Sequence, residues 1–400
     1  MLLDNFAGVR IDGSNATIIG SKQGEFVADR NNITRVWMDH GVWPMITTKF
    51  YIDQTGDLEL LEKEAAYFKD KQIARGTRTD TLWDESYGCW QKTKRGVREE
   101  GTILEHLLLQ NLTAFYEVGE HNNIRLRGAD WNDALNITTD PEAESVMLSH
   151  QFCLAFRELK LLMEKIGETD YAEFLKKEYD TMRKTINEKA WDGEWYMRAL
   201  SKKENIGSRT SEGSKIYLNA QTWAVLGDVA DEEKLPKLLA AVDSMEHDFG
   251  FPLNMPPYEK YSPNVGRMSG MLPGLFENGG VYCHATGFKI LMDCKLGRAE
   301  KALCTLKKIM PDSEKNPSTQ SGAEPYVFTN CYSTHPKYYG KSYWSWTTGT
   351  SAWCMKGLYE GIMGVKRGYD GLEITPCFPK EWERAEMTRH FRNADYHIVI

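Results

Sequence analysis

Apolar residues recur at helical spacing along most of the chain, and long polar stretches interrupt them. The pattern predicts helices at ten places: 36–52, 57–70, 102–118, 141–166, 170–190, 214–230, 231–245, 281–294, 298–309 and 345–364. Glycines at 56, 167 and 297 separate successive helices, which predicts helices paired head to tail. Pro44 either kinks the first helix or marks its true start.

The remaining segments lack this periodicity. Residues 1–35, 246–280 and 311–341 are rich in Gly, Pro or Asn and predict long loops, whereas GLEITPCFPKEW and ADYHIVI after Tyr369 predict strands. Helical hairpins of this kind can close into an α/α toroid with the loops gathered over a central cavity. We therefore predict a mainly α protein in three parts: an irregular entry segment 1–35, a helical toroid 36–366, and an incomplete β domain 367–400. On this interpretation the chain is a fragment of a longer protein.

The amino-acid composition excludes some classes of function for this protein. Charged residues make up 26% and the net charge is −8, so nucleic acid and anionic membrane are not expected partners. Aromatic residues reach 12%, with 12 Trp and 19 Tyr, which suits carbohydrate binding or an aromatic core. The eight Cys form no CxxC pair or zinc grid, so we predict no metal site and reduced thiols, as in the cytoplasm. We find no signal peptide and no run of about 18 apolar residues.

The stretch RLRGADWNDALN, residues 125–136, concentrates the chemistry expected of a sugar site. Asp130, Trp131, Asn132 and Asp133 supply a flat apolar face, an amide for hydroxyl groups, and an acid. Buried loops seldom crowd polar groups in this way, because each group needs a hydrogen-bond partner. The alternative is a polar turn in which Asp133 or Asn136 caps the following helix.

Two further segments lie at the starts of predicted helices. ENGGVYCH places Glu277 before two glycines and His284 at a helix start, where free backbone N–H groups favour an anion such as phosphate. WTTGT, residues 346–350, offers hydroxyl groups and an exposed backbone that can surround an anion oxygen. Ordinary alternatives are a histidine bonded to a loop carbonyl and helix capping by a threonine.

A third segment, RIDGSNATIIG, contains Arg10 and Asp12 in an irregular loop. A guanidinium group suits both phosphate and vicinal hydroxyls, although a structural Arg–Asp pair is an equal alternative. Asp39 and His40 could line a pocket or pair within a helix. The chain has no GxGxxG, P-loop, GxSxG or HExxH motif. This excludes nucleotide binding by those motifs, a serine-hydrolase nucleophile elbow and a zincin metal site.

The chain resembles the inverting glycoside phosphorylases of glycoside hydrolase family 94. Four motifs carry this resemblance, in this order: GADWNDALN, ENGGVYCHA, WTTGTSAW and EGIMGVKRGYDGLEITPCFPKEW. The resemblance covers about residues 30–400. It implies an (α/α)6 barrel between β-sandwich domains, of which the upstream one is absent here. It also implies a homodimer in the full-length protein.

The resemblance implies roles for individual residues. Asp133 matches the family's general acid, and Trp131 its sugar-binding neighbour. Glu277 matches a residue that contacts the sugar in the family. The family's phosphate contacts are matched by His284, Thr348 and Gly349. RIDGSNATIIG takes the place of the family's RDxxQD loop, which it matches only at Arg10 (phosphate) and Asp12 (sugar).

This residue set agrees with phosphorolysis. Phosphate is already an anionic nucleophile, so it needs positioning and one acid, whereas an inverting hydrolase needs an acid and a base. We therefore expect cleavage of a β-linked gluco-oligosaccharide by inorganic phosphate, giving an α-sugar 1-phosphate and a shortened saccharide without any cofactor. The alternatives are an inverting β-glycosidase with a second carboxylate, or a truncated fragment that binds carbohydrate without turning it over.

Overall fold

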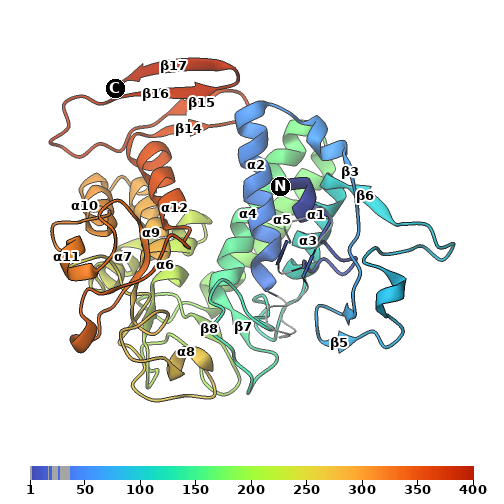
Figure 1. Ribbon diagram of the computed structural model, residues 1–400, viewed down its shortest axis with the longest axis horizontal. Coiled ribbons are helices and arrows are strands. Elements are labelled where there is room, and N and C mark those ends of the chain that lie inside the picture. Colours follow the sequence, from blue (N-terminus) through green and yellow to red (C-terminus); the bar gives the residue numbers. More distant parts are fainter. Residues whose placement is uncertain (1, 17, 20–25, 28–36) are drawn as a thin grey trace. The chain divides into compact units, whose positions relative to one another are not determined.

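The computed structural model describes residues 2–16, 18–19, 26–27 and 37–400, and its contacts divide these into two units (Figure 1). The first unit comprises residues 1–133 and 141–182, and the second comprises 134–140 and 183–400. Residues 1, 17, 20–25 and 28–35 of the predicted entry segment 1–35, together with the first residue of the helix predicted at 36–52, lie outside the described residues. The described part of that segment includes a short helix, α1 (Leu2–Phe6).

The first unit is built around three helices that follow the predicted apolar pattern. Their bounds are α2 (Val42–Thr55), α3 (Ile103–Phe115) and α4 (Val146–Ile166). Thr102 and Glu105 form a reciprocal capping box that starts α3. Helix α2 packs against α4, and α3 also contacts α4. Pro44 lies in the first turn of α2, so it marks the start of the helix and does not kink it.

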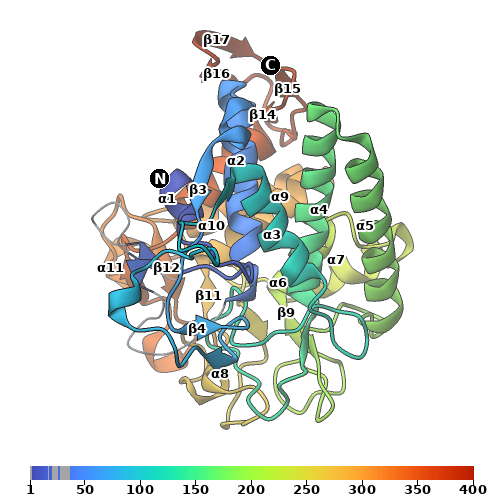
Figure 2. The same cartoon turned by 90° about the vertical axis from the view of Figure 1, so that its right-hand side faces the viewer.

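The predicted pair 141–166 and 170–190 is confirmed as α4 and α5 (Thr169–Lys189), which run side by side in both views (Figures 1 and 2). Gly167 ends α4 with a left-handed backbone at φ 87°, a conformation that glycine adopts without the steric cost of a Cβ. Helix α4 begins only at Val146, capped by Ser145. Asp133 and Asn136 are therefore not its caps, which removes the capping alternative for that helix.

The predicted helix at 57–70 is wrong. A 3-10 turn, η2 (Glu59–Glu62), is followed by strand β3 (Glu64–Ala66), which pairs antiparallel with β6 (Glu100–Thr102). This pairing with a distant strand outweighs the local helical propensity of the segment. The other short elements of this unit are β1 (Ile18–Ile19), β2 (Phe26–Val27), η1 (Met38–Gly41), β4 (Gln72–Ile73), β5 (Arg78–Thr79), η3 (Glu85–Tyr87) and β7 (Glu144–Ser145).

The second unit is centred on α9 (Cys283–Lys295), which packs against α6 (Leu218–Leu226), α10 (Ala299–Ile309) and α12 (Thr350–Lys356). A π-helical turn, η6 (Gly357–Ile362), extends α12. The remaining helices are η4 (Glu232–Lys234), α7 (Leu235–Asp243), α8 (Arg267–Gly270), α11 (Ser318–Ser321) and η5 (Pro336–Tyr338). One buried apolar cluster of the unit consists of Phe249, Val281, Cys283, Ile290, Ala302, Leu303, Leu306, Ile309, Tyr332, Cys354 and Ile362.

The predicted loop 311–341 is only partly irregular. It contains β12 (Thr329–Tyr332), the central strand of a sheet formed with β11 (Val281–Tyr282) and β13 (Ser342–Ser345). Both pairings are antiparallel, so strands join the segments that precede α9 and α12. This sheet orders both predicted phosphate segments.

Strands at the C-terminal end begin slightly earlier than the predicted Tyr369. Their bounds are β14 (Val365–Arg367), β15 (Leu372–Ile374), β16 (Glu386–Phe391) and β17 (Ala394–Val399). They form two antiparallel hairpins. The other strands of the unit are β8 (Ala199–Leu200), β9 (Ile216–Tyr217) and β10 (Asn254–Met255). Among the described helices, none has the length and apolarity needed to cross a membrane.

Candidate active site

The WND segment in the first unit is held by hydrogen bonds from Asp130. This side chain is fully buried, and its two carboxylate oxygens accept from the Asn132 backbone N–H (2.9 Å) and from the Ser145 hydroxyl (2.6 Å). Because Ser145 also caps α4, Asp130 fixes the segment to the start of that helix. Trp131 and Asp133, on either side of the buried Asn132, are only partly buried. Asp130 is thus an anchor, whereas Asp133 retains access for chemistry.

A second carboxyl group lies beside this segment. Asp39, in η1, is buried, and burial raises its pKa to about 7, with the charges of Asp130 and Asp133 adding to the rise. One of its oxygens accepts from the Trp43 indole N–H at 2.6 Å. The other oxygen makes no hydrogen bond within the described part of the chain. Of the two alternatives for Asp39, the bond to Trp43 four residues later supports pairing within the helical segment, while the charges of Asp130 and Asp133 show that the WND segment is also close.

The side chains of Arg10 and Asp12 are engaged with protein groups. Arg10 forms a bidentate pair with Asp70, both distances being 2.9 Å, and it is 4% exposed. Asp12 accepts from the Ser14 backbone N–H and hydroxyl and from the backbone N–H of Arg75. The Arg–Asp pair is therefore made with Asp70, not with Asp12. The predicted ligand roles of Arg10 and Asp12 stay predictions, and their described contacts favour a structural role.

In the second unit, the ENGG segment adopts a backbone that explains its residue types. Asn278 joins the loop to two others by accepting from the Tyr258 N–H and donating to the carbonyls of Tyr258 and Met271. Gly279 has φ 80°, and a Cβ there would lie 2.7 Å from Pro257. A Cβ on Gly280 would lie 2.7 Å from the Phe276 carbonyl oxygen. Glu277 is 6% exposed at the start of this segment.

The structure brings His284 and Gly349 into contact. A Cβ added to Gly349 would lie 2.9 Å from Cε1 and 3.1 Å from Nε2 of the His284 ring, so only glycine lets the backbone approach this closely. His284 is in the first turn of α9, and Gly349 is the N-cap residue of α12. Neither N-cap position makes a side-chain capping bond. The N-terminal ends of α9 and α12, whose first backbone N–H groups have no partner within their own helix, therefore meet at this point.

Thr348 is joined to the same sheet through Asn330, a residue that no pattern in the sequence singles out. The Thr348 hydroxyl donates to Asn330 Oδ1 at 2.9 Å, and Asn330 Nδ2 donates to the Tyr282 hydroxyl at 3.1 Å. The Thr350 backbone N–H donates to the Thr348 hydroxyl at 3.2 Å, which is a local bond of the kind expected from capping. Asn330 lies in the segment predicted as a loop, and its partners are 18 and 48 residues away. No local signal could have identified it.

Burial by its neighbours lowers the pKa of His284 to about 4. Its ring packs against Phe288 and Trp353, at centroid distances of 4.9 and 6.1 Å. The imidazole is therefore neutral at pH 7 and would meet an anion as a hydrogen-bond donor rather than as a cation.

This burial predicts a pH dependence of stability. The folded pKa of about 4 lies below the ordinary value of 6.5, so the unfolded chain binds the proton first as the pH falls. We expect the wild type to lose up to about 3 kcal/mol of unfolding free energy between pH 6.5 and 4, relative to His284→Gln. Urea unfolding at a series of pH values measures this difference. Parallel curves for the two proteins would show that His284 is not buried as a neutral group.

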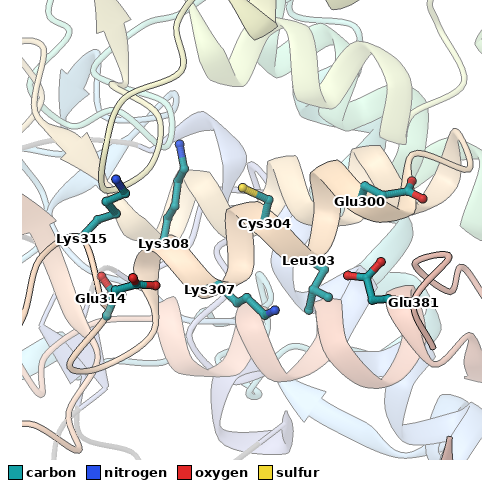
Figure 3. Close-up of a pocket in the computed structure, with 9 residues that line it drawn as sticks. Glu300, Leu303, Cys304, Lys307, Lys308, Glu314, Lys315 and Glu381 are labelled. Atoms are coloured by element: carbon teal, nitrogen blue, oxygen red, sulfur yellow. The ribbon is translucent and has the colours of Figure 1, made fainter. Parts of the chain in front are cut away.

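A cavity of about 320 Å³ lies along α10 of the second unit (Figure 3). Three lysines, three glutamates, Leu303, Cys304 and Ser313 line it. Lys308 is bonded to the Glu246 carboxylate and the His247 carbonyl. An anion entering here would meet carboxylates as well as lysines, and none of the nine lining residues is a predicted site residue.

Comparisons with known proteins agree with the motifs. Residues 88–364 match the model of the glycosyl hydrolase 94 superfamily, catalytic domain. The chain is 35% identical over 372 residues to solabiose phosphorylase of Paenibacillus borealis, covering 91% of this chain and 44% of that protein. It is 32% identical over 370 residues to 3-O-beta-D-glucopyranosyl-beta-D-glucuronide phosphorylase of the same organism, covering 90% and 44%. The chain thus spans less than half the length of these two curated relatives.

A solved structure shares the fold. The GH78 family rhamnosidase of Bacillus sp. GL1 superposes with a TM-score of 0.57 and 15% sequence identity. The match covers 91% of this chain and 31% of that protein. At this identity the likeness concerns the fold alone.

Proposed function

The chain belongs to the glycosyl hydrolase 94 superfamily, and we propose that it is the catalytic part of an inverting glycoside phosphorylase. The substrate is a β-linked gluco-oligosaccharide, and the products are an α-sugar 1-phosphate and a saccharide shortened by one unit. The names of the two Paenibacillus relatives support phosphorolysis but differ in saccharide, so they do not fix the linkage. The helical pairs are proposed to belong to an (α/α)6 barrel.

In the proposed reaction a phosphate oxygen attacks the anomeric carbon from the face opposite the glycosidic bond, which inverts the configuration. Asp133 donates its proton to the leaving glycosidic oxygen as the bond breaks. Trp131 and Glu277 contact the sugar. The reverse reaction uses the Asp133 carboxylate to accept the proton of the attacking hydroxyl. Inorganic phosphate is a co-substrate, and the proposal includes no metal or organic cofactor.

The observation that carries the proposal is the close approach of His284 to Gly349, where the N-terminal ends of α9 and α12 meet. Backbone N–H groups at such ends point outward and carry a partial positive charge, which favours a phosphate-sized anion. The Thr348 hydroxyl is the third proposed contact, and phosphate would compete there with Asn330. For the full-length protein we further propose a homodimer in the cytoplasm.

Hydrolysis is the second candidate, because one observation favours it. An inverting glycosidase needs a second carboxylate as the base that activates water. Asp39, with a pKa of about 7 and Asp133 among its charged neighbours, is a carboxyl group of the required kind. Incubation of the chain with β-linked disaccharides, with and without phosphate, separates the candidates. Sugar 1-phosphate formed only with phosphate supports phosphorolysis, and reducing sugar released without phosphate supports hydrolysis.

Replacement of His284 by alanine tests the anion site. Removing a hydrogen bond to a charged group is expected to raise the KM for phosphate by about 10-fold to 100-fold. The KM for saccharide should change by less than about threefold, which initial rates with each substrate varied in turn will show. His397→Ala, an exposed histidine on β17, serves as the matched control. Equal changes in both KM values for His284→Ala would contradict a phosphate role.

A further inference from the structure

An exposed group of aromatic side chains lies in the second unit beside the ENGG and WTTGT segments. Trp344 is 56% exposed and Trp346 67%, and Phe276 completes the group, which we call the aromatic surface. Trp344 belongs to β13, which has β12 as its only neighbour in the described sheet and therefore forms its edge. Large aromatic side chains bury much area when they fold inward, so two exposed tryptophans only two positions apart need an explanation.

The rings of the aromatic surface are held in place by defined contacts. Phe276 and Trp344 stack at a centroid distance of 4.7 Å with an interplanar angle of 24°. Phe276 also meets the edge of Tyr343 at 5.1 Å. The Trp346 indole N–H donates to Glu324 Oε1 at 3.1 Å. Rings ordered in this way lose little conformational entropy when a ligand binds.

The backbone under these rings is strained. Phe276, Trp344 and Trp346 have φ of 48°, 55° and 71°, in the left-handed region that bulky residues rarely adopt. Among the described non-glycine residues with positive φ, these three are the only aromatic ones. Left-handed backbone at a bulky residue costs free energy, and such strain is typical of ligand-binding positions. The chain therefore holds these three residues in their observed conformation at a cost to folding.

The aromatic surface is continuous along the chain with the proposed site. Phe276 directly precedes Glu277, and Trp346 is two residues before Thr348. The β11–β12–β13 sheet joins both segments to the start of α9, where His284 lies. A molecule on this surface is therefore a neighbour of the residues proposed to bind sugar and phosphate.

We infer that the aromatic surface binds a pyranose ring of the saccharide substrate by stacking on Trp344 and Trp346. The equatorial hydroxyls of β-linked glucosyl units leave flat C–H faces, which match exposed indole rings. Phe276 covers Trp344 from one side, and the exposed part of the indole remains for the sugar. The inference rests on the proposed function for the identity of the ligand. On this inference, Trp344 and Trp346 contribute to the affinity for saccharide and have no role in phosphate binding.

Trp344→Ala and Trp346→Ala test this inference. The wild type is first assayed with cellobiose, laminaribiose, sophorose and N,N'-diacetylchitobiose, and titration calorimetry gives the Kd of each disaccharide. We expect each substitution to raise both the Kd and the KM for the best disaccharide by tenfold or more. The KM for phosphate should stay within twofold, because the rings do not touch the anion. Tyr261→Ala, an exposed tyrosine of the same unit, is the matched control.

Two further variants separate binding from folding. Trp344→Phe keeps an aromatic ring and should retain most of the affinity. Trp344→Gly removes the ring but accepts the positive φ, so we expect unchanged or higher thermal stability together with the same loss of saccharide affinity as Trp344→Ala. A Trp344→Gly protein that melts lower and binds normally would overturn the inference, since the ring would then serve folding alone.

The outcomes distinguish this inference from the proposed function. If the wild type carries out phosphorolysis and both alanine variants keep its saccharide KM, the inference about the aromatic surface is overturned. The proposed function then still holds. Saccharide binding that depends on Trp344, without any sugar phosphate, supports the surface and overturns phosphorolysis. A change from dimer to monomer in Trp344→Ala, measured by analytical ultracentrifugation with unchanged saccharide Kd, would assign the surface to a second copy of the chain. Binding of none of the four disaccharides by the wild type would also contradict the inference.

Discussion

Asp133→Asn is expected to lower the turnover of phosphorolysis by about 10²–10⁴-fold, the range typical of a lost general acid. The amide keeps the shape of the side chain but has no proton to give to the leaving glycosidic oxygen. Saccharide affinity should change little, because an amide can still form a hydrogen bond to that oxygen. Synthesis from the sugar 1-phosphate should suffer equally, since the carboxylate must then accept a proton. Measurement of kcat in both directions checks this expectation.

Asp130→Asn is the matched control, because it makes the same chemical change three residues earlier. The Asp130 carboxylate accepts two hydrogen bonds that anchor the segment, so its loss should appear mainly as lower thermal stability. An α-glycosyl fluoride used in the synthetic direction should not rescue Asp133→Asn, because the acceptor must still lose its proton. Near-normal turnover in Asp133→Asn would place the acid elsewhere, with Glu277 and Asp39 as the next residues to replace.

Arg10→Ala is expected to destabilise the protein by about 3–5 kcal/mol. The substitution leaves the Asp70 carboxylate buried without the guanidinium that now binds both of its oxygens. A bidentate charged pair of this geometry is costly to break from one side, because the remaining charge has lost its solvent and its partner. Urea unfolding followed by circular dichroism measures the change in unfolding free energy.

Arg10→Ala and two further variants decide whether Arg10 has a structural role or binds phosphate. Arg10→Lys should recover only part of the stability, since an ammonium group cannot bind both carboxylate oxygens in the same fork. The double replacement of Arg10 and Asp70 by alanine should cost less than the sum of the single replacements. A loss below about 1 kcal/mol, together with a raised KM for phosphate, would contradict the structural role and support the ligand role implied by the family resemblance.

Several helices follow from local sequence because their causes are local. The apolar face of 102–118 and the break at Gly167 each depend on residues within a few positions of one another, and both appear in the structure. The ENGG and WTTGT segments were also recognisable from their residue types, because the glycines reflect the backbone that these segments require. The roles of Asp133 and His284 came from motif resemblance and stay proposals.

Other features depend on partners far along the chain, and local patterns do not contain them. Segment 57–70 has a helical pattern, but pairing with Glu100–Thr102 makes part of it a strand. Arg10 binds Asp70, which is 60 residues away, and leaves the nearby Asp12 to the loop backbone. Asn330 joins Thr348 and Tyr282 only because β12 lies between their segments.

The sequence by itself determined the helical character of this protein, the breaks between its helices, and the chemical types gathered in its loops. Only the tertiary structure decided which of those groups come into contact and which protonation state each of them has. The raised pKa of Asp39 comes from burial and from carboxylates more than 90 residues later in the sequence. The contact between His284 and Gly349 requires α9 to pack against α12. Periodicity and capping act over a few residues, whereas burial and electrostatics act through space, and only the folded chain sets those distances.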